Sequence, residues 1–120
     1  MSDNEVPSWY SCESWESATI DLSDFGMGAA HIVDATAERK YQWYQAAQKD
    51  ALAAETTAKL LAAYVEGGDM AAGFPARSAK WEKWLEWMRT QRAKPVERLT
   101  QGIMRFMSDS TAKAEDAPKS

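Results

Sequence analysis

The stretch that decides the expected fold covers residues 24–66 and reads DFGMGAAHIVDATAERKYQWYQAAQKDALAAETTAKLLAAYVE. It is rich in alanine, lacks proline and, after Gly28, lacks glycine until Gly67. Ser23 or Asp24 can cap the start of a helix, and Gly67 suits the left-handed residue that follows a last helical turn. The sequence therefore predicts one helix over residues 24–66, a rod about 60 Å long at the usual rise of about 1.5 Å per residue.

Apolar residues in this stretch return every seven positions. A sustained heptad is typical of a helix packed lengthwise against another helix, and alanine lets the two axes approach closely. Two interpretations stay open, because the stripe can be the core face of an ordinary bundle helix or a surface for self-association. The residues of this predicted helix seam are Ala37, Tyr44, Ala51, Ala54, Ala58, Leu61 and Val65.

Shorter helices are expected on the C-terminal side, over residues 76–93 and 95–107. Pro75 suits the start of the first, and Lys94-Pro95 separates the two. Residues 1–22 are polar and serine-rich and predict an irregular arm, whereas residues 108–120 lack large apolar residues and predict a disordered tail. Since we find no useful alternation of period two, the predicted fold class is all-α, a helical hairpin or bundle formed by residues 23–107.

The most distinctive segment is WEKWLEWMR at residues 81–89. On a helix its large apolar residues gather on one side. They can fill the space that the alanines leave in the protein's own core, or form a partner-binding face, since tryptophan is favoured at interface hot spots. A membrane-surface helix is a weaker interpretation and nucleic acid the weakest, because the chain is acidic and has no binding motif. The candidate partner-binding residues are Trp81, Trp84, Leu85, Trp87 and Met88, with Trp9 and Trp15 of the arm.

Residues that could carry chemistry are few. His31 is the only histidine and Cys12 the only cysteine, so the chain cannot form an internal disulfide or a Cys/His zinc cluster. No glutamate precedes a histidine at the spacing of a di-metal bundle, and Gly26-Met27-Gly28 lacks the rest of a phosphate loop. We therefore predict no catalytic, metal or cofactor-binding residue and a protein that is not an enzyme.

Charge is unevenly distributed along the chain. Residues 1–76 carry a net charge of −8, residues 77–105 carry +5, and the last 15 residues carry −1, which gives −4 in all. This polarity favours pairing of the two halves within one molecule or head-to-tail association. The acidic N-terminus does not look like a signal peptide and no apolar run is long enough to span a bilayer, so we expect a soluble intracellular protein.

A weak likeness of composition bears on function. The small-residue start at residues 25–30, followed by an Ala/Gln-rich stretch with Tyr41, Trp43 and Tyr44, resembles helical internal or accessory proteins of tailed phages. The function that we predict is that of an interaction or structural protein that oligomerises or docks in a larger assembly. The resemblance implies a phage-type virion or accessory component, located within a virion or other assembly, whereas the expected location without it is the cytoplasm. The alternative is a small acidic inhibitor or adaptor that binds one host protein, and the third is a peripheral membrane-surface helix protein.

Overall fold

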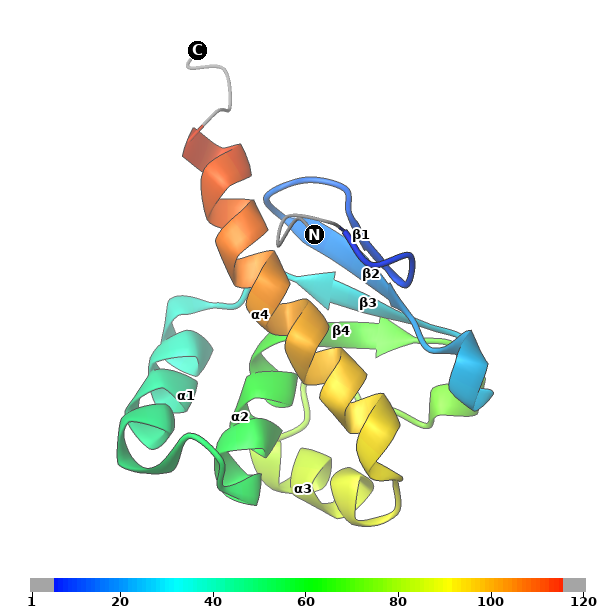
Figure 1. The fold of residues 1–120 in the computed structure, drawn as a ribbon. Helices are drawn as coiled ribbons and strands as arrows, with labels where there is room; N and C mark the ends of the chain where they lie inside the picture. The colour runs from blue at the N-terminus through cyan, green and yellow to red at the C-terminus, as the bar shows by residue number, and fades with distance from the viewer. Residues whose placement is uncertain (1–5, 116–120) are drawn as a thin grey trace.

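The computed structural model describes residues 6–115 of the 120-residue chain. The chain forms both strands and helices (Figure 1). The strands are β1 (Tyr10–Cys12), β2 (Ser17–Asp21), β3 (Ala29–Val33) and β4 (Val65–Gly68). The α-helices are α1 (Ala37–Asp50), α2 (Ala54–Tyr64), α3 (Trp81–Arg89) and α4 (Ala93–Glu115), and 3-10 turns form η1 (Ser23–Phe25) and η2 (Met70–Ala72). The fold is α+β, so the all-α prediction is wrong.

The predicted helix over residues 24–66 is absent. Its residues form β3, α1, α2 and β4 in turn, and the molecule measures 42 × 32 × 30 Å, too short for the expected rod. Two positive-φ glycines, Gly26 at 73° and Gly28 at 69°, turn the chain between β2 and β3, a conformation that other residues rarely adopt. Alanine favours helices, but Ala30 is buried between two paired strands, and this packing overrides its local propensity.

The N-terminal and C-terminal predictions also need correction. The expected irregular arm contains β1 and β2, and the expected disordered tail continues α4 as far as Glu115. Residues 1–5 and 116–120 lie outside the described residues. The helix expected over 76–93 is shorter, since α3 covers Trp81–Arg89. Pro95 does not begin a separate helix but lies in the first turn of α4, where its missing N–H costs no helical hydrogen bond.

The sheet is antiparallel throughout, with the strands in the order β1-β2-β3-β4. Side chains alternate between its faces, as the pleat requires. One face carries the buried residues Tyr10, Ala18, Ile20, Ala30, Ile32 and Val65. The other face carries Ser11, Thr19, His31 and Gly67 in one row across the four strands.

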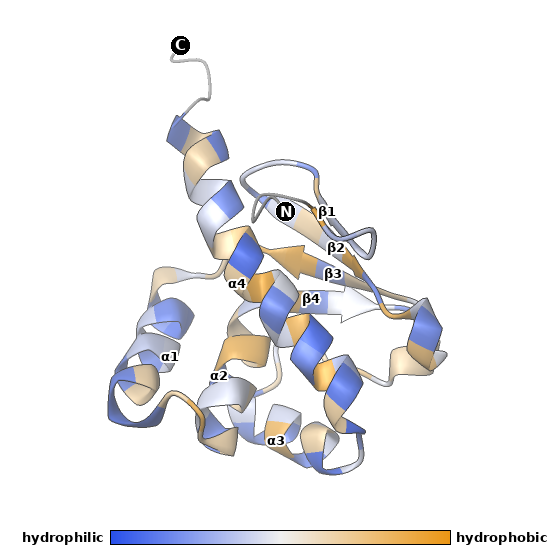
Figure 2. Ribbon diagram, in the orientation of Figure 1, coloured by the Kyte–Doolittle hydropathy of each residue, from blue (hydrophilic) through white to orange (hydrophobic). Residues whose placement is uncertain are grey.

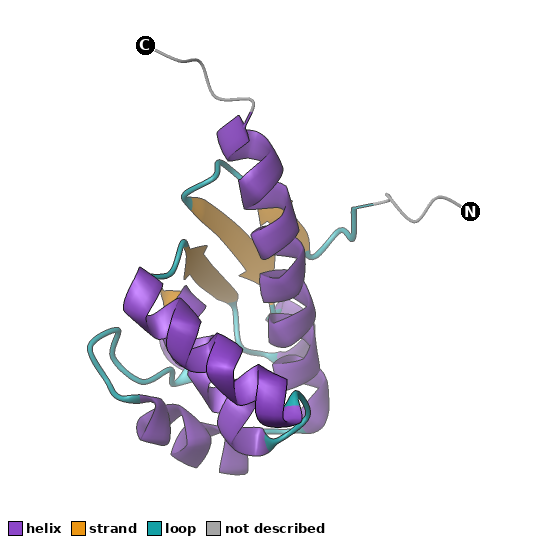
Figure 3. Ribbon diagram, turned by 90° about the vertical axis from the view of Figure 1, so that its left-hand side faces the viewer, coloured by secondary structure: helices purple, strands orange, loops and turns teal. Residues whose placement is uncertain are grey.

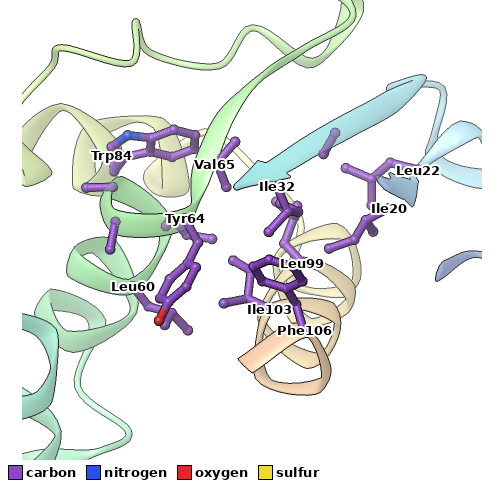
Figure 4. Close-up of a cluster of buried hydrophobic side chains, with 14 of the residues drawn as sticks. Ile20, Leu22, Ile32, Leu60, Tyr64, Val65, Trp84, Leu99, Ile103 and Phe106 are labelled. Atoms are coloured by element: carbon purple, nitrogen blue, oxygen red, sulfur yellow. The ribbon is translucent and has the colours of Figure 1, made fainter. Parts of the chain in front are cut away.

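The core lies between the inner face of the sheet and the helices. Helix α4 crosses this face (Figures 1 and 3), and its apolar residues alternate with polar ones (Figure 2). Gly102 permits the close approach, because a Cβ there would collide with the side chain of Ile20 on β2. The central side chains, labelled in Figure 4, are fully buried and include Ile20, Leu22, Ile32, Leu99, Ile103 and Phe106.

The second glycine that the packing requires is Gly68 in β4. A Cβ there would lie 2.5 Å from the carbonyl oxygen of Ala29 and 2.7 Å from the ring of Phe74. The pair Gly67-Gly68, expected to stop a helix, thus belongs to a strand that pairs with β3. Among residues 6–115, no helix is both long enough and apolar enough to cross a membrane.

Candidate protein-binding surface

Helix α1 exposes aromatic side chains that the core does not use. Thr36 caps its start by accepting a hydrogen bond from the backbone N–H of Arg39, yet none of its 14 residues is buried. Tyr41 and Tyr44 keep 65% and 51% of their surface in contact with solvent, and Trp43 is half-buried. Trp43 packs against the edge of the core, whereas the rings of Tyr41 and Tyr44 leave apolar area exposed to solvent.

The turn between α1 and α2 presents a leucine to solvent in a fixed position. Leu52 is 94% exposed. Its backbone N–H donates to the carboxylate of Asp50 at 3.1 Å, and the hydroxyl of Thr56 donates to the carbonyl oxygen of Asp50 at 2.7 Å. Because these hydrogen bonds fix the backbone of the turn, Leu52 is held in its exposed position.

The other end of α1 is anchored by Arg39. Its guanidinium donates to the carbonyl oxygens of Ala62 at 2.7 Å and Arg77 at 3.1 Å. Arg77 donates in turn to Ala62 and Ala63, so two guanidinium groups satisfy carbonyls at the end of α2. Burial, followed by the nearby charge of Arg39, lowers the pKa of Arg77. This anchor holds α1 against α2 without burying the aromatic rings.

An apolar groove of about 310 Å³ runs between α1, α2 and α4. It lies beside Leu52, and Met104 on α4 is 51% exposed at its border. We call Tyr41, Trp43, Tyr44, Leu52 and Met104 the aromatic surface. The groove is lined by Trp43, Ala47, Ala51, Leu52, Thr56, Thr57, Leu60, Thr100 and Met104. Exposed apolar side chains beside an apolar groove are typical of a site of protein interaction.

Sequence reasoning did not select most of the aromatic surface. A signal was present, because positions 41, 43 and 44 point in widely different directions around a helix and cannot all face one core. Tyr44 was assigned to the helix seam, but that seam does not exist as one stripe. Ala37, Tyr44, Ala51 and Ala54 are exposed, whereas Ala58, Leu61 and Val65 are buried.

The tryptophan-rich helix lies mainly in the core. Trp84 and Trp87 are 1% and 7% exposed, and the indole N–H of Trp87 donates to the carbonyl oxygen of Ala72 at 2.9 Å. Trp81, Leu85 and Met88 are half-buried against this cluster. A partner or a membrane could reach Trp84 and Trp87 only if their rings left the core.

The tryptophans of the N-terminal region lie apart from α3. Trp9 is half-buried, with the guanidinium of Arg98 at 5.3 Å from its ring. Trp15 is 42% exposed in the turn between β1 and β2. The structure therefore does not combine the seven candidate residues into one surface.

Catalytic groupings are not evident in the described part of the chain. His31 is exposed on the outer face of the sheet, and Cys12 is half-buried with its thiol near the carbonyl oxygen of Ser14. Burial and the hydrogen bond that Tyr10 donates to the carboxylate of Asp109, at 3.0 Å, raise the pKa of Tyr10. Within residues 6–115, no three His, Cys, Asp or Glu side chains are placed to hold a metal ion.

Comparisons with protein family models, with curated proteins and with solved structures find no match for this chain.

Proposed function

We propose that this protein acts by assembly, with copies of the chain associating through the aromatic surface. The observation that carries the proposal is α1, which has three aromatic residues within four positions and no buried residue. Aromatic side chains are enriched in protein interfaces, where their burial supplies much of the binding free energy. The structural or accessory role in a larger, phage-type assembly, in the cytoplasm or within a virion, remains part of this proposal.

A second copy is the partner that we favour, because the same surface presents both an exposed leucine and an apolar groove. Leu52 protrudes beside the apolar groove, so two copies related by a twofold axis can each insert Leu52 into the groove of the other. Burying one leucine contributes about 1.5–3 kcal/mol, and the symmetry doubles this contribution. Without association, the same leucine contributes almost nothing to folding.

Sedimentation velocity tests this proposal over protein concentrations of about 1 to 100 µM. The wild type should change from monomer to dimer within this range, and Leu52→Ser should weaken association by about 100-fold or more. Met70→Ser is the matched control, because Met70 is 98% exposed on η2, away from the groove residues. A wild type that stays monomeric throughout, or an equal effect of the two substitutions, overturns the proposal.

The acidic adaptor is the second candidate, and a separate observation favours it. Residues 6–38 contain no lysine or arginine, and exposed carboxylates lie on or beside the sheet at Glu13, Glu16, Asp21 and Asp34. A basic protein surface would complement this charge. Binding of a lysine-rich peptide, and its loss in Glu13→Gln/Glu16→Gln/Asp34→Asn and at high salt, would support this function. No binding at low salt would reject it, whereas association through the aromatic surface should persist in salt.

A further inference from the structure

A cavity of about 550 Å³ lies where the turn between α3 and α4 meets η1, which is blue at the right of Figure 1. Its volume is within the range of about 300–1,000 Å³ that is typical of small-molecule sites. It shares no residue with the groove beside α1. The lining residues are Phe25, Met27 and residues 90–95.

The apolar wall of this cavity is held in place by contacts already present. Phe25 is half-buried, with the guanidinium of Arg98 at 4.6 Å from its ring. Arg98 also donates to the carboxylate of Asp24 and to the carbonyl oxygen of Asp21, each at 3.1 Å. Met27 is 6% exposed, and Pro95 is buried. An apolar ligand would therefore meet a wall that needs little rearrangement, which limits the entropic cost of binding.

Cationic side chains also line the cavity. Residues 87–96 contain three bases, Arg89, Arg92 and Lys94, and no acid. All three bases are exposed, and Arg92 and Lys94 line the cavity. No ion pair in the part of the chain that the structure describes engages these three side chains. The nearby carboxylate of Asp24 is paired with Arg98, so it does not neutralise them.

We propose that this cavity binds a small apolar carboxylate. The apolar body of the ligand lies against Phe25, Met27 and Pro95, and its carboxylate accepts hydrogen bonds from Arg92 and Lys94. Apolar walls with a few charged groups that fix orientation are the usual composition of a ligand site. The apolar part supplies most of the affinity, and the two cations select an anion over a neutral molecule of the same length.

Octanoate is a suitable probe, with 1-octanol and acetate as its neutral and short counterparts. Each is titrated into the full-length, isotopically labelled protein while the backbone amide resonances are followed. Octanoate should shift the amides of Phe25, Met27 and residues 90–94 in a saturable way, octanol should bind about tenfold more weakly, and acetate should not saturate. Equal affinities for octanoate and octanol, or shifts spread over the whole surface, overturn the proposal.

Matched variants separate this site from general charge attraction. Arg92→Gln/Lys94→Gln should weaken octanoate binding about tenfold and leave octanol binding unchanged. Lys49→Gln/Lys113→Gln removes the same charge from α1 and α4 residues that do not line the cavity, and should leave octanoate binding unchanged. Ala93→Phe places a ring in the cavity and should abolish binding while the amide spectrum elsewhere stays native. Equal weakening by the two charge variants, or unchanged binding by Ala93→Phe, contradicts the proposal.

Discussion

Replacing Trp84 by alanine tests directly whether the tryptophan-rich helix belongs to the core. Trp84 is 1% exposed. Its ring centroid lies 5.5 Å from that of Phe74 and 5.5 Å from that of Trp87, with interplanar angles of 38° and 72°. Removing the indole removes its contacts with both neighbouring rings and opens a cavity that the backbone of α3 cannot readily close.

The expected cost follows from the buried area. A buried tryptophan removes about 200 Å² from water, which at about 25 cal/mol per Å² amounts to roughly 5 kcal/mol. Measured substitutions of this kind cost about 3–5 kcal/mol, so we expect a loss of about 4 kcal/mol in the free energy of unfolding. For a chain of 120 residues, with an unfolding entropy of about 250 cal/mol/K, the midpoint temperature should fall by about 16 °C.

Urea unfolding followed by far-ultraviolet circular dichroism measures this loss, since the signal does not depend on tryptophan fluorescence. Tyr41→Ala is the control, because Tyr41 is 65% exposed and its removal should change stability by less than about 0.5 kcal/mol. If Trp84→Ala is already unfolded without urea, Trp84→Phe should still fold and lose about 1–2 kcal/mol.

A loss below about 1 kcal/mol in Trp84→Ala, with an unchanged dependence on urea concentration, would refute this reasoning. The ring would then not be part of the core, and a partner-binding role for Trp84 would become the better interpretation.

Three further substitutions test other parts of the fold by urea unfolding. Tyr64→Phe should leave stability unchanged or slightly higher at pH 7, because the buried hydroxyl of Tyr64 has no hydrogen-bond partner among the described residues. Burial, with a smaller effect of the Asp34 charge, raises the pKa of Tyr64 to about 12, so the unfolded chain loses this proton first and stability falls from about pH 10 to pH 12. Tyr64→Phe should reduce this loss of stability. An unchanged loss between about pH 10 and pH 12 would disprove that the ionisation of Tyr64 causes it. Gly28→Ala should lower the free energy of unfolding by about 2 kcal/mol, since φ is +69° and the new Cβ would overlap the Asp69 side chain. A loss below about 0.5 kcal/mol would contradict this packing. Arg39→Met should lower the free energy of unfolding by about 1–3 kcal/mol, because the carbonyl oxygens of Ala62 and Arg77 both lose hydrogen bonds from Arg39, although Ala62 keeps one from Arg77. An unchanged stability would show that the anchor of α1 is not needed.

Local patterns in the sequence identified the amphipathic parts of the C-terminal half. The helix predicted over residues 95–107 lies within α4, where Leu99, Ile103 and Phe106 are fully buried on one face. Such a pattern is readable because the spacing repeats within one element. Only the ends of these helices were misplaced, where the sequence signal is weakest.

The strands were missed because their signal is short. Residues 17–21 of β2 alternate polar and apolar side chains, with Ala18 and Ile20 buried, but the alternation lasts only five residues. In β3, the alanines favour a helix locally, and the strand is stabilised by pairing with β2 and β4. Ile32 pairs with Val65, which lies at the far end of the stretch predicted as one helix. Local propensity contains no information about a strand partner so distant in the chain.

The candidate surface shows the same division between local and tertiary information. The sequence by itself determined that the chain has amphipathic helices, a concentrated set of tryptophans and a separation of acidic and basic segments. The tertiary structure alone decided that Trp84 and Trp87 are buried while Tyr41, Tyr44 and Leu52 face solvent. An aromatic residue packs equally well into its own core or into a partner, so its location depends on which faces the sheet and α4 leave uncovered.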